Sequence, residues 1–137
     1  MSYTIDVLKK PLYLHLKVAG ENSLKSVREY LMEVLEICAR NNCLNVLIEE
    51  NLVGQRLNTL DVFNVVRSGL SHAGRYPQVI AYIDVNAGQE PGLMLFAESL
   101  AVNRGINIRV FNSVHDAEAW LESTLRADPG TLPPKEN

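Results

Sequence analysis

The first part of the chain alternates between apolar and polar residues in the way expected of two short strands. Tyr3–Leu8 and Leu12–Val18 are rich in β-branched, aromatic and other apolar residues. Lys9–Pro11 lies between them and has the composition of a turn. We therefore expect the chain to open with an antiparallel hairpin.

Helical and extended patterns alternate along the rest of the chain. From Ser23 onward, apolar residues recur at spacings of three and four, which predicts a helix that Ser23 caps and that ends near Asn41 and Asn42. Three further strands are expected at Leu44–Glu49, Val79–Val85 and Ile106–Phe111. Three further helices are expected at Leu60–His72, capped by Asn58 or Thr59 and closed by Gly74; from Pro91 to Arg104 or Gly105; and after a cap at Ser113, with Ala117, Trp120 and Leu121 facing inward.

This order of elements predicts an α/β fold. Strands that are joined through single helices pair in parallel with right-handed crossovers. The expected architecture is a single mixed, mostly parallel five-stranded sheet with an N-terminal antiparallel hairpin and four helices. Residues 1–125 would form this domain, and residues 126–137 have no apolar stripe and are expected to be a disordered tail.

One face of the predicted sheet is expected to be only half covered. Tyr13, His15 and Lys17 interrupt the apolar residues of the second strand, whereas a strand buried on both faces is continuously apolar. A mixed surface of this kind suits a homodimer contact or a ligand floor, and partial cover by one helix explains it equally well. Extending the alternation places on this face Leu47, Ile80, Tyr82 and Phe111, beside Asn45, Asp84, Asn107 and Arg109.

Charge and hydropathy exclude several classes of partner. The chain has 13 Lys and Arg against 16 Asp and Glu, a net charge of -3, without a basic block that would neutralise a row of phosphates. Nucleic acid is therefore not an expected partner. Apolar runs are shorter than the about 18 residues of a membrane span, and the polar start differs from a signal peptide. We expect a soluble, cytoplasmic protein without a membrane span.

The residues that carry common enzyme chemistry do not form a recognisable motif. Cys38 and Cys43 have neither the redox spacing nor the spacing of a zinc site, and they are expected to be reduced structural thiols. The sequence also lacks the nucleotide-binding glycine motifs, the zinc-protease helix and the nucleophile elbow. We therefore expect no cofactor, no metal and no enzymatic activity.

Candidate binding residues gather where the predicted parallel strands end, because ligands of open α/β sheets bind there. Glu49 or Glu50 beside Asp84 could hold a cation or act as a general base, and they could equally be solvated strand ends. The loop from Glu50 to Asn58 contains an apolar pair that could close over an apolar ligand. The candidate ligand or partner residues are Glu49, Glu50, Asn51, Leu52, Val53, Asn58, Asp84 and Asn86.

The order of elements, together with the closing strand Ile106–Phe111 and the helix residues Asp116–Leu121, resembles the STAS superfamily. The form I-x-I-R-V-F followed by A-x-A-W-L more closely resembles its SpoIIAA-like branch, also described as STAS/SEC14-like; the superfamily includes the anti-sigma-factor antagonists. In phosphorylatable members, the loop after the third strand carries an Asp-Ser-Ser-Gly-like motif. Residues 57–60 occupy this place here and contain none of that motif, so the resemblance implies Thr59 as the candidate phosphoacceptor.

Three hypotheses about function follow. The leading one is a non-catalytic STAS-like module that binds a small, apolar or lipid-like ligand or a protein partner. The alternative is an antagonist-type signalling protein that phosphorylation of Thr59 controls. An outside hypothesis is a small hydrolase or isomerase that uses Glu49, Glu50 or Asp84 as a base.

Overall fold

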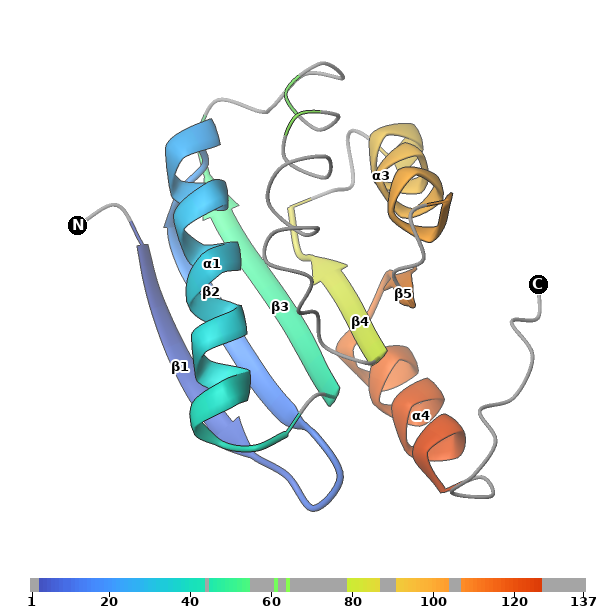
Figure 1. Cartoon of the computed structure of the whole chain (residues 1–137). Helices are drawn as coiled ribbons and strands as arrows, with labels where there is room; N and C mark the ends of the chain where they lie inside the picture. The colour runs from blue at the N-terminus through green and yellow to red at the C-terminus, as the bar shows by residue number, and fades with distance from the viewer. Residues whose placement is uncertain are drawn as a thin grey trace.

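The structure is a computed structural model of the chain, and it describes residues 3–43, 45–54, 61, 64, 79–86, 91–103 and 107–126. Figure 1 shows the described elements arranged around one sheet. In chain order they are β1 (Tyr3–Lys9), β2 (Leu14–Glu21), α1 (Leu24–Arg40), β3 (Asn45–Val53), β4 (Val79–Asp84), α3 (Pro91–Asn103), β5 (Ile108–Phe111) and α4 (Val114–Leu125).

The sheet has the predicted topology. Its five strands lie in the order β1-β2-β3-β4-β5, with β1 antiparallel to β2 and the other neighbours parallel. Three helices are described where four were predicted. The predicted helix Leu60–His72 lies outside the described residues apart from Asp61 and Asn64, and so does the predicted tail apart from Arg126.

Both predicted serine caps are present and explain where two helices begin. The Ser23 hydroxyl accepts a hydrogen bond from the Ser26 backbone N–H at 3.0 Å, and the Ser113 hydroxyl accepts one from Asp116 at 3.1 Å. Each cap satisfies a backbone donor that the first helical turn leaves without a partner. At the other end of α1, Asn42 adopts a left-handed conformation that turns the chain toward β3.

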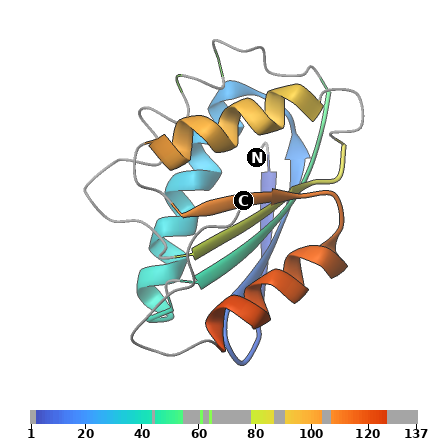
Figure 2. The same cartoon turned by 90° about the vertical axis from the view of Figure 1, so that its right-hand side faces the viewer.

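Apolar clusters on both faces of the sheet hold the layers together. On one face, α1 packs against a cluster that includes Leu16, Val18 and Ile48. On the other, Ala117 and Leu121 of α4 are fully buried in a second cluster. Figure 2 shows the sheet between α1 and α4.

The prediction of which residues share the α4 face was partly wrong. Leu47 and Phe111 belong to the α4 cluster as predicted, but Ile80 and Tyr82 pack in the α1 cluster. The parallel register aligns Leu47 with Ala81, so the residues of β4 that face α4 are Val79, Ala81 and Ile83. Asp84 falls on the α1 face for the same reason, because successive side chains of a strand point to opposite faces.

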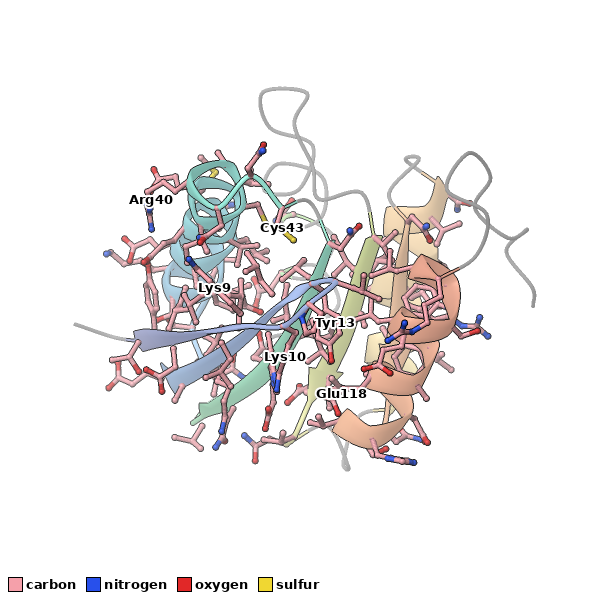
Figure 3. All side chains as sticks on the ribbon, turned by 90° about the horizontal axis from the view of Figure 1, so that it is seen from below. Lys9, Lys10, Tyr13, Arg40, Cys43 and Glu118 are labelled. Atoms are coloured by element: carbon pink, nitrogen blue, oxygen red, sulfur yellow. The ribbon has the colours of Figure 1, made fainter. Side chains whose placement is uncertain are left out.

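The α4 face keeps an open portion over β2. Lys17 and Ala19 of β2 are exposed there, while Tyr13 before β2 donates a hydrogen bond to Glu118 of α4 at 3.2 Å. Figure 3 looks at the end of the sheet where Tyr13 and Glu118 lie near each other. None of the described helices is long and apolar enough to cross a membrane.

Candidate functional site

Glu50 lies near the carboxyl end of β3, and its side chain enters the core beneath α1. Its side chain shares a face with Ile48 and Leu52, both fully buried, and Glu50 itself is only 6% exposed. Burying a carboxylate is costly unless hydrogen bonds compensate for the lost water. Two tyrosine hydroxyls provide them: Tyr30 of α1 donates to Oε2 of Glu50, and Tyr82 of β4 donates to Oε1 at 2.5 Å.

The environment of these tyrosines favours their neutral, donating forms. Burial raises the pKa of Tyr30 well above its ordinary value, and the Glu50 carboxylate raises it further. The pKa of Tyr82 is raised for the same two reasons, burial first and Glu50 second. The three side chains therefore form a hydrogen-bonded group in which the carboxylate is an acceptor on both oxygens. We call Tyr30, Glu50 and Tyr82 the buried triad.

Glu49 points to the opposite face of the sheet. Its Oε1 lies 2.8 Å from Nε2 of His15, a buried residue of β2. Glu50 is the register partner of Asp84, so of the two glutamates it is the one that shares a face of the sheet with Asp84. Neighbouring residues of a strand face opposite sides, so Glu49 and Glu50 do not act on one ligand.

Asn86 joins the ends of β3 and β4. Its side-chain amide donates to Oδ1 of Asn51 at 2.9 Å and to the backbone carbonyl of Leu52 at 2.8 Å. Its backbone N–H donates to Oδ1 of Asp84 at 2.9 Å, which closes a tight turn after β4. The structure thus brings together three of the predicted residues, Asn51, Asp84 and Asn86.

Leu52 and Val53 lie in a strand, which corrects the prediction that they form part of a loop. Both pair with the end of β2, opposite Gly20 and Glu21, so β3 continues past Glu49. Leu52 is 1% exposed and belongs to the core, which removes it from any apolar lid. Val53 is 60% exposed, and the strand ends there because Gly54 turns the chain with a φ of +117°.

Two exposed apolar side chains lie at the ends of β3 and β4, one of them within the turn that Asn86 closes. Val53 ends β3, and Val85 follows β4 with 45% of its surface exposed. The backbone N–H of Val85 donates to the carbonyl of Glu50 at 2.9 Å, which fixes this residue against β3. We call Asn51, Val53, Val85 and Asn86 the carboxyl-end corner.

Asn58 and Thr59 lie outside the described residues. Within the described part of the chain, no three His, Cys, Asp or Glu side chains are grouped so as to hold a metal ion. Both cysteines are free thiols in the structure, with Cys38 buried.

The sequence indicates that Glu50 needs a partner, but it does not identify Tyr30 and Tyr82. Val46, Ile48, Glu50 and Leu52 alternate on one face of β3, so an acidic side chain falls on an otherwise apolar stripe. A carboxylate in such a position is almost always paired. The partners themselves could not be identified, because Tyr30 and Tyr82 have the same spacing as ordinary core residues of a helix and a strand.

Comparison with known proteins identifies the fold. No family model matches the sequence, and no curated protein matches it. The structure is similar to the crystal structure of an anti-sigma factor antagonist from Mycobacterium paratuberculosis, with a TM-score of 0.54 and 10% sequence identity. The match covers 88% of this chain and 95% of that chain. The resemblance predicted from the sequence is therefore confirmed at the level of the fold.

Proposed function

We propose that the chain is a non-catalytic module that binds a protein partner through the carboxyl-end corner. The observation that carries the proposal is the pair of exposed valines, Val53 and Val85, beside exposed amide groups at the ends of β3 and β4. Apolar side chains with polar neighbours are typical of protein contact surfaces. The fold supports the same proposal, because the similar protein is named for opposing an anti-sigma factor, which is itself a protein.

The hydrogen bonds of the acidic residues favour binding over catalysis. A general base needs a lone pair within reach of its substrate. Glu50 is instead buried beneath α1, out of reach of a substrate, with both oxygens accepting from tyrosines, while Glu49 contacts His15 and Asp84 accepts from a backbone N–H. The hypothesis that an apolar ligand binds under the loop rested on the apolar pair Leu52 and Val53. It loses this support because Leu52 lies in the core.

Affinity capture with matched valine variants tests this proposal. Val53→Lys and Val85→Lys place a charge in the corner, whereas Val102→Lys places the same charge on an exposed position of α3. The tagged parent and the variants are used to enrich partners from the native source, with quantitative mass spectrometry as the readout. We expect a specific partner to be lost with both corner variants and retained with Val102→Lys. Equal capture by all variants would contradict the proposal.

Native mass spectrometry of the purified protein separates the two kinds of binding. We expect no copurified small molecule after denaturation. A stoichiometric apolar or amphipathic compound would instead support the ligand form of the hypothesis. The predicted homodimer remains a prediction, and the subunit count in the same spectrum tests it.

A second candidate function is antagonist-type signalling controlled by phosphorylation of Thr59. The shared fold supports it, and the acceptor is assigned from the sequence resemblance. A phosphate at a helix N-terminus would meet favourable backbone N–H groups. We expect phosphoproteomics of the native source to find Thr59 modified and Thr59→Glu to weaken partner capture while Thr59→Ala does not. An unmodified Thr59 with equal capture by both variants would refute this candidate.

A further inference from the structure

Among the described strands, β1 lies at the outer margin of the sheet and pairs with β2 alone. The Lys10 backbone N–H donates to the carbonyl of Tyr13 at 2.9 Å, directly across the hairpin. Because hydrogen-bonded pairs alternate along an antiparallel ladder, Asp6 and Leu8 direct their backbone groups toward β2. Ile5 and Val7 therefore direct their N–H and C=O groups outward, where an added strand can pair with them.

A groove runs beside this margin, between β1 and the outer side of α1. It has a volume of about 330 Å³ and is lined by Tyr3, Arg28, Glu29, Met32, Glu33 and Glu36. Met32 is 38% exposed there, and Val7 on the same face of β1 is 39% exposed. Figure 1 shows β1 as the outermost strand with α1 lying over this side of the sheet. An edge strand with an adjacent helix and an open groove between them is the arrangement that receives an added peptide strand.

The side chains that line the groove are mainly acidic, which favours a basic partner. Three glutamates line it against one arginine, and Glu36 is exposed. Tyr3 lies close to these glutamates, and its hydroxyl donates to Glu33 at 2.7 Å. The pKa of Tyr3 is raised to about 12, first by burial and then by Glu33, Glu29 and Glu36. Lys25 offsets Glu29 through an ion pair, so the remaining acidic character lies toward Glu33 and Glu36.

We propose that β1 and this groove dock an extended basic segment of a protein, which adds to the sheet as a sixth strand. Its backbone pairs with Ile5 and Val7, and its alternate side chains enter the groove beside Met32 and the glutamates. This surface lies on the opposite margin from α3 and apart from the carboxyl-end corner, so it is a second interaction site. A second copy of this chain fits the edge poorly, because two-fold pairing of β1 strands brings two rows of α1 glutamates together.

Exposed long edge strands are usually protected against such pairing. The charges of β1 lie at Asp6, whose backbone faces β2, and at Lys9, where the strand ends. The middle of the outward edge, at Ile5 and Val7, carries only apolar side chains. An added strand can therefore pair with both Ile5 and Val7 without meeting a charged side chain on β1 at either residue.

A synthetic peptide tests the proposal on the intact chain. The probe is an acetylated, amidated peptide of alternating lysine and valine that matches the seven residues of β1. Its controls are the same peptide with glutamate for lysine and a version N-methylated at alternate residues, which cannot pair as a strand. We expect saturable binding of the basic peptide alone, together with slowed hydrogen exchange at the Ile5 and Val7 amides.

Protein variants separate strand pairing from charge attraction. Val7→Pro removes one outward donor and should weaken binding about fivefold or more, whereas Val7→Thr keeps the donor and should bind like the parent. Glu36→Lys should weaken binding about fivefold, and the matched control Glu122→Lys on α4 should leave it unchanged. If Val7→Pro fails to fold, the N-methylated peptide provides the same test on the unmodified protein.

Three results would overturn the proposal. The first is equal binding of the basic and N-methylated peptides, because attraction would then be purely electrostatic. The second is unchanged exchange at Ile5 and Val7 when the peptide is saturating. The third is a dimer of the chain alone, by light scattering, that Val7→Pro converts to a monomer, since the occupant would then be a second copy.

Discussion

Replacing Tyr30 by phenylalanine removes one of the two hydroxyl groups that donate to the buried Glu50 carboxylate. The ring remains, so the packing of α1 on the sheet is preserved. A hydrogen bond to a charged group contributes about 1.5–3 kcal/mol to stability. We expect Tyr30→Phe to lower the free energy of unfolding by that amount and the melting temperature by roughly 5–12 °C.

Tyr3→Phe is the matched control for this prediction. The Tyr3 hydroxyl also donates to a glutamate, Glu33, but it lies at a partly exposed position where water can replace it. We expect this variant to lose less than about 1 kcal/mol. The assay is urea unfolding at pH 7, followed by circular dichroism. The free energy of unfolding in water is compared among the parent and the variants, and an equal slope against urea concentration shows that only stability has changed. Equal losses for the two variants would refute the reasoning that burial makes the triad bond important.

Three further predictions concern the core, the thiols and the alkaline range. Leu121→Ala, which empties a fully buried position under α4, should cost about 2–5 kcal/mol in urea unfolding. Burial raises the pKa of Cys38 to about 11, so a thiol reagent should modify Cys43 first and Cys38 only on unfolding; equal rates would contradict this. Burial and then Glu118 raise the pKa of Tyr13 from 10.0 to about 12, so its contribution to stability is complete below pH 10 and is lost between pH 10 and about 12. Tyr13→Phe should make this alkaline decline, followed by urea unfolding at several pH values, less steep than in the parent.

The candidate site could be predicted only as a region. The rule that ligands bind where parallel strands end placed Asn51, Asp84 and Asn86 together, and the structure connects them: the Asn86 side-chain amide donates to Asn51, and its backbone N–H donates to Asp84. The same rule could not separate Glu49 from Glu50. The alternation of Val46, Ile48, Glu50 and Leu52 indicates that Glu50 falls on the more apolar face of β3, but only the packing of the helices decides which residues meet it there.

The sequence also predicted the end of β3 too early. The apolar run ends at Glu49, and the sequence Glu50–Val53 has no clear strand alternation when it is considered alone. In the structure this segment is extended because β2 continues beside it, opposite Gly20 and Glu21. Backbone hydrogen bonds to a neighbouring strand outweigh a weak local preference. The predicted loop was therefore too long, and Leu52 was placed in the wrong environment.

The sequence by itself determined the order of the described elements, the hairpin at the start and the caps at Ser23 and Ser113. These features depend on spacing within a few residues, on turn composition and on side chains that bond to their own helix. Only the tertiary structure decided the register of β4 against β3, which places Tyr82 beneath α1 and Ala81 toward α4. It also decided the partners of Glu50, since Tyr30 lies 20 residues and Tyr82 32 residues away along the chain. Contacts between distant segments arise when strands align and layers pack, and a one-residue shift would have exchanged the two faces.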